Sequence, residues 1–254
     1  MSNEARVGGG SPDGFPPQKP WRHRTVNGAL VVVAAYLVVA YIVMPIDWRH
    51  YTRRHPALEN ISDVTHTTTG IPGDPLNVAV IGTENDLKRI MVAAKWYPAD
   101  ALTLKSCLEI AEATVLKRPY PEAPVSSLYF EGRKEDLAFE MPVGDNPRKR
   151  HHVRFWRTKK LDGDGRPAWV GSATYDEHVG LSDTTGEVTH HIAPNVDAER
   201  DHVMATLKAT GDVAEEYAVA GFHKVDQGVN GGGDPWHTDG NLDVAVTKGT
   251  ATGD

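Results

Sequence analysis

Hydrophobic positions are most concentrated near the N-terminus, in a stretch from Gly28 to Ile46 that contains no charged residue. As a helix, this stretch spans about 28 Å, close to the roughly 30 Å hydrocarbon core of a membrane. Trp21 and Trp48 lie on either side of it, where aromatic side chains gather at membrane interfaces. The pattern predicts a single transmembrane helix over residues 25–47. The alternative is a cleaved signal peptide, which the lack of a small-residue cleavage signature disfavours.

The segments on either side of this helix are polar. Residues 1–24 are rich in Gly, Pro and polar residues without apolar periodicity, which predicts a disordered tail. Residues 48–74 contain the turn-forming strings TTTG and PGDP, which predict a linker. Positive charges flanking the helix are nearly balanced, and Arg6 tips the count toward the N-terminal side. We therefore expect a cytoplasmic N-terminus and an extracytoplasmic soluble domain.

The soluble domain is predicted over residues 75–247. LNVAVIGT at 76–83 indicates a buried strand leading into a helix capped by Thr83, with Leu87, Ile90, Met91 and Ala94 on one face. Two further helices are expected, at 103–116 and 196–210. Strands outnumber helices and do not alternate with them, which predicts an α+β fold with a largely antiparallel sheet and a few packed helices. Residues 248–254 are predicted to form a flexible tail.

The composition limits the classes of molecule that the protein can bind. The net charge of −7 over 254 residues argues against nucleic acid as a partner, because a polyanionic backbone requires a basic surface. The one cysteine, Cys107, excludes an internal disulfide and a multi-cysteine metal site, and its place on a predicted helix face indicates core packing.

Candidate chemistry is concentrated in the histidine-rich half of the chain. The strings HHVRFWR and AWVGSATYD are predicted to form a hairpin closed by the turn at Asp162–Arg166. Because alternate strand residues share a face, the register that pairs like faces puts His152 opposite Asp176 and Arg154 opposite Thr174. A carboxylate beside an imidazole fits a general base or the support of a metal ligand. An ordinary cross-strand ion pair is the alternative.

Other histidines could complete such a site. A catalytic cluster is predicted from His152, Asp176, His190, His191 and His237. On an extended strand each His-His doublet aims one ring at a given point, so the two doublets supply at most two metal ligands. His237, Asp239, His178 or His223 would have to complete the site, and we take His152, His191 and His237 as the ligands of a divalent metal such as zinc. The close spacing of recognised zinc motifs is absent, and a site without metal stays open.

Two further features suggest an anionic ligand. Arg150 and Arg154 belong to a basic run interleaved with aromatic residues, suited to a phosphate on a lipid or small molecule. Gly231, Gly232 and Gly233 could let backbone amides converge on an anion. The alternatives are a solvated edge strand and a flexible connection.

Long strings of this chain, including PLNVAVIGT, KWYPADALTLKS, NPRKRHHVRFWR, TTGEVTHHI and GGGDPWHTDG, resemble the LssY-like C-terminal domain of bacterial membrane-associated proteins. The resemblance covers about 75–246 and implies a bacterial inner membrane location. In that family the domain often follows multi-spanning modules of DedA-like or phosphatidic-acid-phosphatase-like type, whereas one span precedes it here. The resemblance assigns no catalytic residues.

Two functions follow as hypotheses. In the first, a single-pass protein of the bacterial membrane binds a ligand, or a partner such as another membrane protein, at the surface of the lipid bilayer, in envelope or lipid processes. In the second, the histidine and aspartate cluster forms a metal-assisted hydrolase for a phosphorylated lipid or other envelope substrate.

Overall fold

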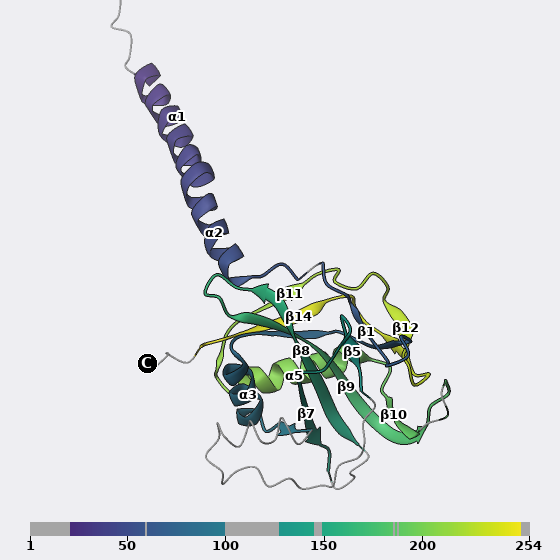
Figure 1. Ribbon diagram of the computed structural model, residues 1–254. Coiled ribbons are helices and arrows are strands. Elements are labelled where there is room, and N and C mark those ends of the chain that lie inside the picture. The colour runs from purple at the N-terminus through teal and green to yellow at the C-terminus, as the bar shows by residue number, and fades with distance from the viewer. Residues whose placement is uncertain are drawn as a thin grey trace, which may run out of the picture. The chain divides into compact units, whose positions relative to one another are not determined.

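The structure of the protein is a computed structural model that describes most of the chain (Figure 1). The described residues are 21–58, 60–99, 127–144, 149–184, 186 and 188–249. The helix predicted at 103–116, with Cys107, lies outside them, as do most of the two predicted tails. The chain divides into two compact units, Met1–His50 and Tyr51–Asp254.

The N-terminal helix runs without a break through α1, a single π-helical segment η1 and α2. These span Trp21–Val38, Val39–Val43 and Met44–Arg54. Within the described residues, Val26–Arg53 is the one helix long and apolar enough to cross a membrane. Its side chains are exposed rather than packed in a core, as Val32 at 69% and Tyr41 at 72% illustrate. The helix is therefore consistent with a single-pass membrane protein. It begins inside the predicted tail and ends beyond the predicted boundary.

The second half of the segment predicted as a linker, 48–74, is folded. Two short antiparallel strands, β1 (Val64–His66) and β2 (Pro72–Pro75), occupy it. Leu58 and Thr65 are fully buried, and the Thr65 hydroxyl donates to the carbonyl of Asp74 across the strand pair. Strands this short, one of them flanked by proline, carry too little alternation to be recognised.

An eight-stranded sheet organises the unit Tyr51–Asp254, with the order β11-β14-β3-β9-β8-β7-β4 and with β10 beside β9. Only the β14–β3 pair within it is parallel, so the predicted α+β class with a largely antiparallel sheet is confirmed. Its strands are β3 (Val78–Ile81), β4 (Tyr97–Pro98), β7 (Leu137–Pro142), β8 (Arg150–Leu161), β9 (Pro167–Leu181), β10 (Val188–Ile192), β11 (Val213–Val219) and β14 (Leu242–Thr247).

Two helices, α3 (Glu84–Ala93) and α5 (Val196–Ala209), pack on one face of this sheet (Figure 1). Thr83 caps α3 as predicted: its hydroxyl accepts the Asp86 amide, while the Asp86 carboxylate accepts the Thr83 amide. The predicted apolar face of α3 is buried in the same core cluster as α5. The helix is therefore held both by its cap and by its hydrophobic face.

The other face of the sheet has its own apolar cluster, which includes Leu58, Leu76, Phe130 and Trp156. A four-stranded sheet, β2-β1-β5-β6, contributes to this cover, with β5 at Tyr129–Phe130 and β6 at Arg133–Lys134. A separate hairpin joins β12 (Gln227–Val229) to β13 (Pro235–His237).

The hairpin of β8 and β9 differs from the predicted register. Next to the turn, Leu161 pairs with Pro167 as expected. Farther on, Arg157 pairs with Trp169, so β8 has two more residues than β9 between these pairs. This irregularity slides the strands by two positions but leaves every side chain on its predicted face.

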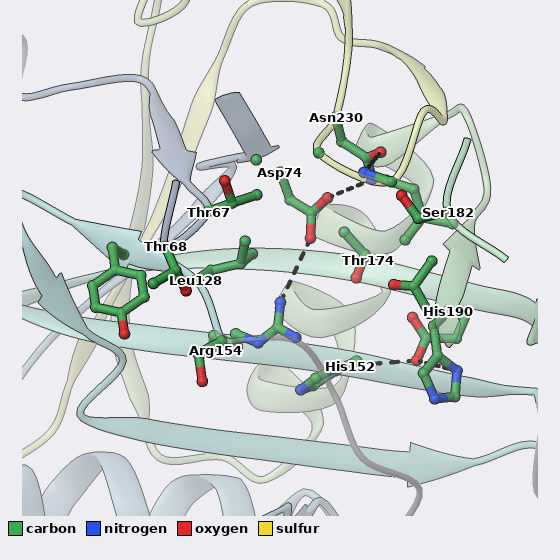
Figure 2. A pocket seen from close by; sticks show the side chains of 18 of the residues that line it. Thr67, Thr68, Asp74, Leu128, His152, Arg154, Thr174, Ser182, His190 and Asn230 are labelled. Carbon is green, nitrogen blue, oxygen red and sulfur yellow. Dashed lines mark hydrogen bonds and ion pairs between the residues drawn. The ribbon is translucent and has the colours of Figure 1, made fainter. Parts of the chain in front are cut away.

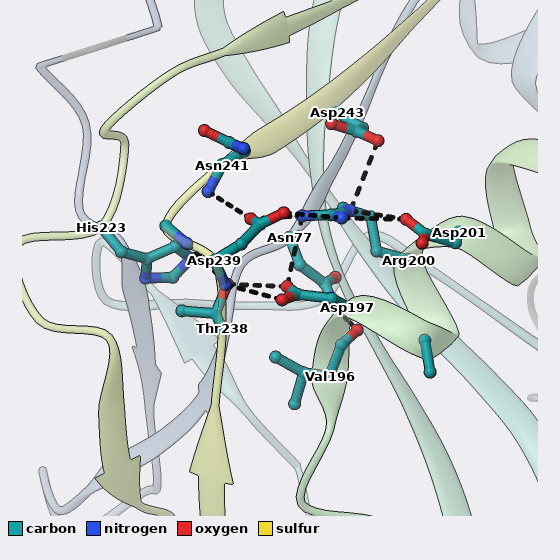
Figure 3. A network of polar contacts seen from close by, with 12 residues as sticks. Asn77, Val196, Asp197, Arg200, Asp201, His223, Thr238, Asp239, Asn241 and Asp243 are labelled. Carbon is teal, nitrogen blue, oxygen red and sulfur yellow. Dashed lines mark hydrogen bonds and ion pairs between the residues drawn. The ribbon is translucent and has the colours of Figure 1, made fainter.

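An ion network centred on the buried Arg200 fixes α5 against the C-terminal strand (Figure 3). The guanidinium of Arg200 donates to both carboxylate oxygens of Asp239 at 2.7 and 3.1 Å, and lies 3.3 Å from Asp243 on β14. Asp197, at the start of α5, accepts the Thr238 hydroxyl at 2.7 Å. These contacts are used in joining elements, so we regard the network as structural.

Candidate functional site

A cavity of about 410 Å³ lies where the large sheet faces the small one (Figure 2). The large sheet supplies one wall: His152 and Arg154 from β8, Thr174 and Asp176 from β9, and His190 from β10. The alternation of β8 and β9 brings these side chains to one face, as the sequence predicted.

The opposite wall comes from segments that are distant in sequence. Asp74 lies on β2, Leu128 precedes β5, and Asn230, Gly231 and Gly232 belong to the loop between β12 and β13. The turn between β1 and β2 adds three consecutive threonines at 67–69. The cavity therefore depends on the packing of both sheets and of the glycine loop.

Arg150 organises the floor beside the cavity. Its side chain is buried and donates from Nε to Asp176 at 2.9 Å and from Nη1 to Glu140 at 2.8 Å. The third bond runs from Nη2 to Nε2 of His190 at 2.9 Å. Because a guanidinium can only donate, Nε2 of His190 must accept, which places the ring proton on Nδ1.

The predicted pair of His152 and Asp176 shares a face but is not hydrogen-bonded. Nδ1 of His152 is 4.0 Å from the Asp176 carboxylate, because the two-residue slip puts His152 opposite Thr174 and gives Asp176 to Arg150. The predicted direct opposition is thus wrong, and so is that of Arg154 with Thr174, since Arg154 pairs with Ser172.

Burial sets the protonation of this group. It lowers the pKa of His152 well below its ordinary value and lowers that of His190 to about 4, with the two neighbouring arginines acting in the same direction. Burial also raises the pKa of Asp176 to about 6, although Arg150 opposes the shift. At neutral pH both imidazoles are therefore uncharged.

Two ring nitrogens in this wall make no hydrogen bond. They are Nε2 of His152 and Nδ1 of His190, both buried, and the latter lies 3.5 Å from the Asp176 carboxylate. A buried polar atom left unsatisfied costs about 1–3 kcal/mol, so a molecule that enters the cavity and bonds these atoms gains that energy.

Arg154 belongs to a second polar chain across the cavity. Its Nη1 lies 3.6 Å from Asp74, whose other oxygen accepts the Asn230 amide at 2.8 Å. Burial is the largest effect on Asp74 and raises its pKa, while Arg154 opposes the shift. The predicted ligand residue Arg154 is therefore in the cavity wall, already facing a carboxylate.

The glycine loop is built differently from the predicted anion nest. The amide of Gly232 donates to the side chain of Asn230 at 2.9 Å, and that of Gly233 donates to the Asn230 carbonyl at 3.1 Å. Gly231 and Gly232 line the cavity, but Gly233 does not. Two of the three amides proposed for an anion are thus used to shape the loop.

The other predicted site residues lie elsewhere. His191 does not line the cavity; its Nδ1 is 2.6 Å from Asp234, and its ring stacks on His178 with centroids 4.7 Å apart. His237 is exposed on β13 and is not part of the wall either. The predicted metal ligands His152, His191 and His237 are therefore not brought together. Across the residues that the structure describes, no group of three or more His, Cys, Asp or Glu is placed to hold a metal ion.

Sequence reasoning missed Asp74, Asn230 and Glu140. Asp74 lies at the end of the segment predicted as a linker. Asn230 directly precedes the three glycines, which alone were considered as a binding feature. Glu140 belongs to the strand string DLAFEM, so the sheet face of its side chain could have been assigned from alternation. Its pairing with Arg150 could not have been predicted from the sequence.

Fold and site together define an α+β domain that follows one apolar helix and holds a polar cavity between two sheets. Residues 58–242 match the family model described as LssY C-terminus, and the chain belongs to that family. The match begins at the buried Leu58, within the segment predicted as linker. Neither curated proteins nor solved structures gave a match.

Proposed function

We propose that the LssY-like domain binds a polar ligand in the cavity between its sheets and does so at a membrane surface, in envelope or lipid processes. The observation that carries this proposal is the buried, unpartnered Nε2 of His152 in the cavity wall. A ligand atom that donates to or accepts from this nitrogen would offset the cost of its burial. The cavity volume lies within the range of small-molecule sites.

Binding is favoured over hydrolysis because the nucleophile and base of a hydrolase are not assembled. In the part of the chain that the structure describes, no hydroxyl or thiol is hydrogen-bonded to His152 or His190. The hydroxyl of Ser182, which lines the cavity, bonds instead to that of Thr184 at 2.9 Å. Covalent catalysis requires a nucleophile within reach of its base.

The location is part of the same proposal. The apolar helix would span the inner membrane of a bacterium, with the soluble domain on the extracytoplasmic side near lipid headgroups or another membrane protein. Protease treatment of intact spheroplasts, with a C-terminal epitope tag on the full chain, tests this orientation. Loss of the tag supports the proposal, and protection of the tag contradicts it.

Native mass spectrometry of the full chain, released from nanodiscs made with its own membranes, tests ligand binding. Thr68 lines the cavity and is exposed, so Thr68→Trp should obstruct the mouth without altering the core. Val225, which is 58% exposed and outside the cavity, provides the matched control Val225→Trp. We expect a bound small molecule in the wild type and in the control, and none in Thr68→Trp. If the mass of bound small molecule were the same in all three proteins, whether present in all or absent from all, the proposal would be refuted.

A further inference from the structure

We infer that the cavity takes an uncharged, polyhydroxylated molecule of the carbohydrate or polyol class, either free or as the headgroup of a lipid. This inference rests on the proposed function and specifies its ligand. It also replaces the anionic ligand expected from the basic run in the sequence.

The charge at the cavity is already compensated. Arg150 lies within hydrogen-bond distance of two carboxylates, those of Glu140 and Asp176, and Arg154 faces Asp74 at 3.6 Å. The cavity and its surroundings therefore contain two guanidinium groups and three carboxylates, all of them buried. A phosphate would have to take a cation away from a buried carboxylate, and stranding such a charge costs several kcal/mol. The site thus opposes a strongly anionic ligand.

The lining instead matches hydroxyl groups. Eight of the nineteen residues that line the cavity carry a hydroxyl of their own. To these the wall adds the carboxylates of Asp74 and Asp176, which accept, and the amide of Asn230. A sugar or polyol hydroxyl both donates and accepts one proton, so it can bond to either kind of group without bringing charge.

The two imidazole nitrogens that make no hydrogen bond fit the same ligand. Nδ1 of His190 carries a proton because Nε2 accepts from Arg150. It lies 3.5 Å from the Asp176 carboxylate without a hydrogen bond, so it can donate to a ligand oxygen placed between the two side chains. Neutral His152 has one ring nitrogen that donates and one that accepts, and either can meet a hydroxyl. Apolar side chains of Leu128 and Ile192 in the wall provide contact for ring C–H groups.

Saturation-transfer difference NMR on the full chain in nanodiscs tests this assignment. The probes are glucose, galactose, mannose and myo-inositol as uncharged polyols, with glycerol 3-phosphate as the anionic probe. We expect transfer to at least one uncharged probe and none to glycerol 3-phosphate, and loss of the signal in Thr68→Trp. A further arm adds glycosyl diacylglycerol to the nanodisc: displacement of the free sugar by this lipid would identify a lipid-borne headgroup as the source.

Substitutions separate charge from shape. Asp74→Asn leaves Arg154 without its carboxylate, so we expect roughly tenfold weaker sugar binding and the appearance of glycerol 3-phosphate binding. Asp164→Asn makes the same change of charge at an exposed position in the hairpin turn and should behave as wild type. Thr174→Val removes one hydroxyl at nearly constant volume and should also weaken sugar binding roughly tenfold. Thermal unfolding of each variant verifies that it is folded.

Two outcomes would overturn the inference. Transfer to glycerol 3-phosphate in the wild type, abolished by Thr68→Trp, would show that the cavity binds an anion and would leave the proposed function intact. Absence of transfer to every uncharged probe would reject the ligand class. The bound mass in native spectra tests the proposed function separately.

Discussion

Arg150 is the residue on which the geometry of the candidate site depends most, because it bonds to Glu140, Asp176 and His190 at once. Arg150→Met would leave two carboxylates buried without their cation. We expect a loss of about 3–5 kcal/mol in the free energy of unfolding, which corresponds to a fall of roughly 6–20 °C in the melting temperature. Thermal unfolding of the full chain in detergent measures this fall.

The control for this substitution is Arg133→Met. The Arg133 side chain is 50% exposed and pairs with Asp136 at 3.2 Å on the surface. An exposed pair contributes at most about 1 kcal/mol, so the variant should melt close to the wild type. Equal losses for both arginines would mean that the buried network does not hold the site together.

A second residue-scale prediction concerns the opposite face of β8, where His151 bonds to Glu199 at 2.7 Å and stacks on His202 with centroids 3.9 Å apart. Burial raises the pKa of Glu199 to about 9 and lowers the pKa of His151, so at pH 7 the protonated carboxyl donates to a neutral imidazole. Since the folded state holds this proton more tightly than the unfolded chain, stability falls as pH rises toward 9.

Glu199→Gln removes that titration and keeps a donor for His151. From pH 6 to pH 8 the free energy of unfolding of the variant should rise by roughly 2 kcal/mol relative to that of the wild type. Urea unfolding at both pH values measures this difference. The exposed Glu177→Gln serves as control and should follow the wild type. A variant whose free energy of unfolding changes between pH 6 and pH 8 by as much as that of the wild type would show that folding does not raise the pKa of Glu199.

At the scale of elements, the loop between β12 and β13 depends on a glycine. Gly233 has a φ of +96°, and a Cβ there would come within 2.6 Å of Asp183. Gly233→Ala should therefore disturb the cavity wall and abolish ligand occupancy in native spectra. Gly221 has a φ of +66° with nothing near its Cβ, so Gly221→Ala shares the backbone strain without the clash and should keep the ligand. Loss of ligand in both variants would contradict the role given to the loop.

The elements that could be predicted are those with a local signal. Strand β3, the cap at Thr83 and the apolar face of α3 follow from periodicity and from hydrogen bonds between near neighbours. The faces of β8 and β9 also follow from alternation, which is why His152 and Asp176 were correctly placed on one side of the sheet.

What could not be predicted depends on distant parts of the chain. The two extra residues in β8 lie between Arg157 and Leu161 and have no sequence signature, yet they decide that Asp176 pairs with Arg150. Asp74 and Asn230 reach the cavity only through the packing of the small sheet and the glycine loop. Periodicity of two or four residues identifies strands and helices, but it does not indicate which distant segments pack together.

At the scale of the whole molecule, the N-terminal helix is expected to retain the full chain in the membrane. Its apolar stretch is long enough to span the hydrocarbon core, so the protein should stay in the pellet after an alkaline carbonate wash. Intact-mass spectrometry of the extracted protein should include the helix. A mature protein that begins after residue 46 and washes off would identify a cleaved signal peptide instead.

Attachment by such a helix would suit a domain that binds its ligand at a membrane surface. The helix would confine the cavity near the headgroups, which raises the encounter rate with any ligand carried by a lipid or a membrane protein. The domain would then need only modest affinity for the ligand itself.

The substitution His152→Leu tests whether this imidazole binds the ligand, through ligand occupancy in native spectra of the full chain. Replacing a buried nitrogen that has no partner by an apolar group should leave the melting temperature unchanged or higher. We expect this stable variant to carry no ligand. A variant that retains the bound mass of the wild type and melts several degrees lower would contradict the account, because His152 would then support the fold without contacting a ligand.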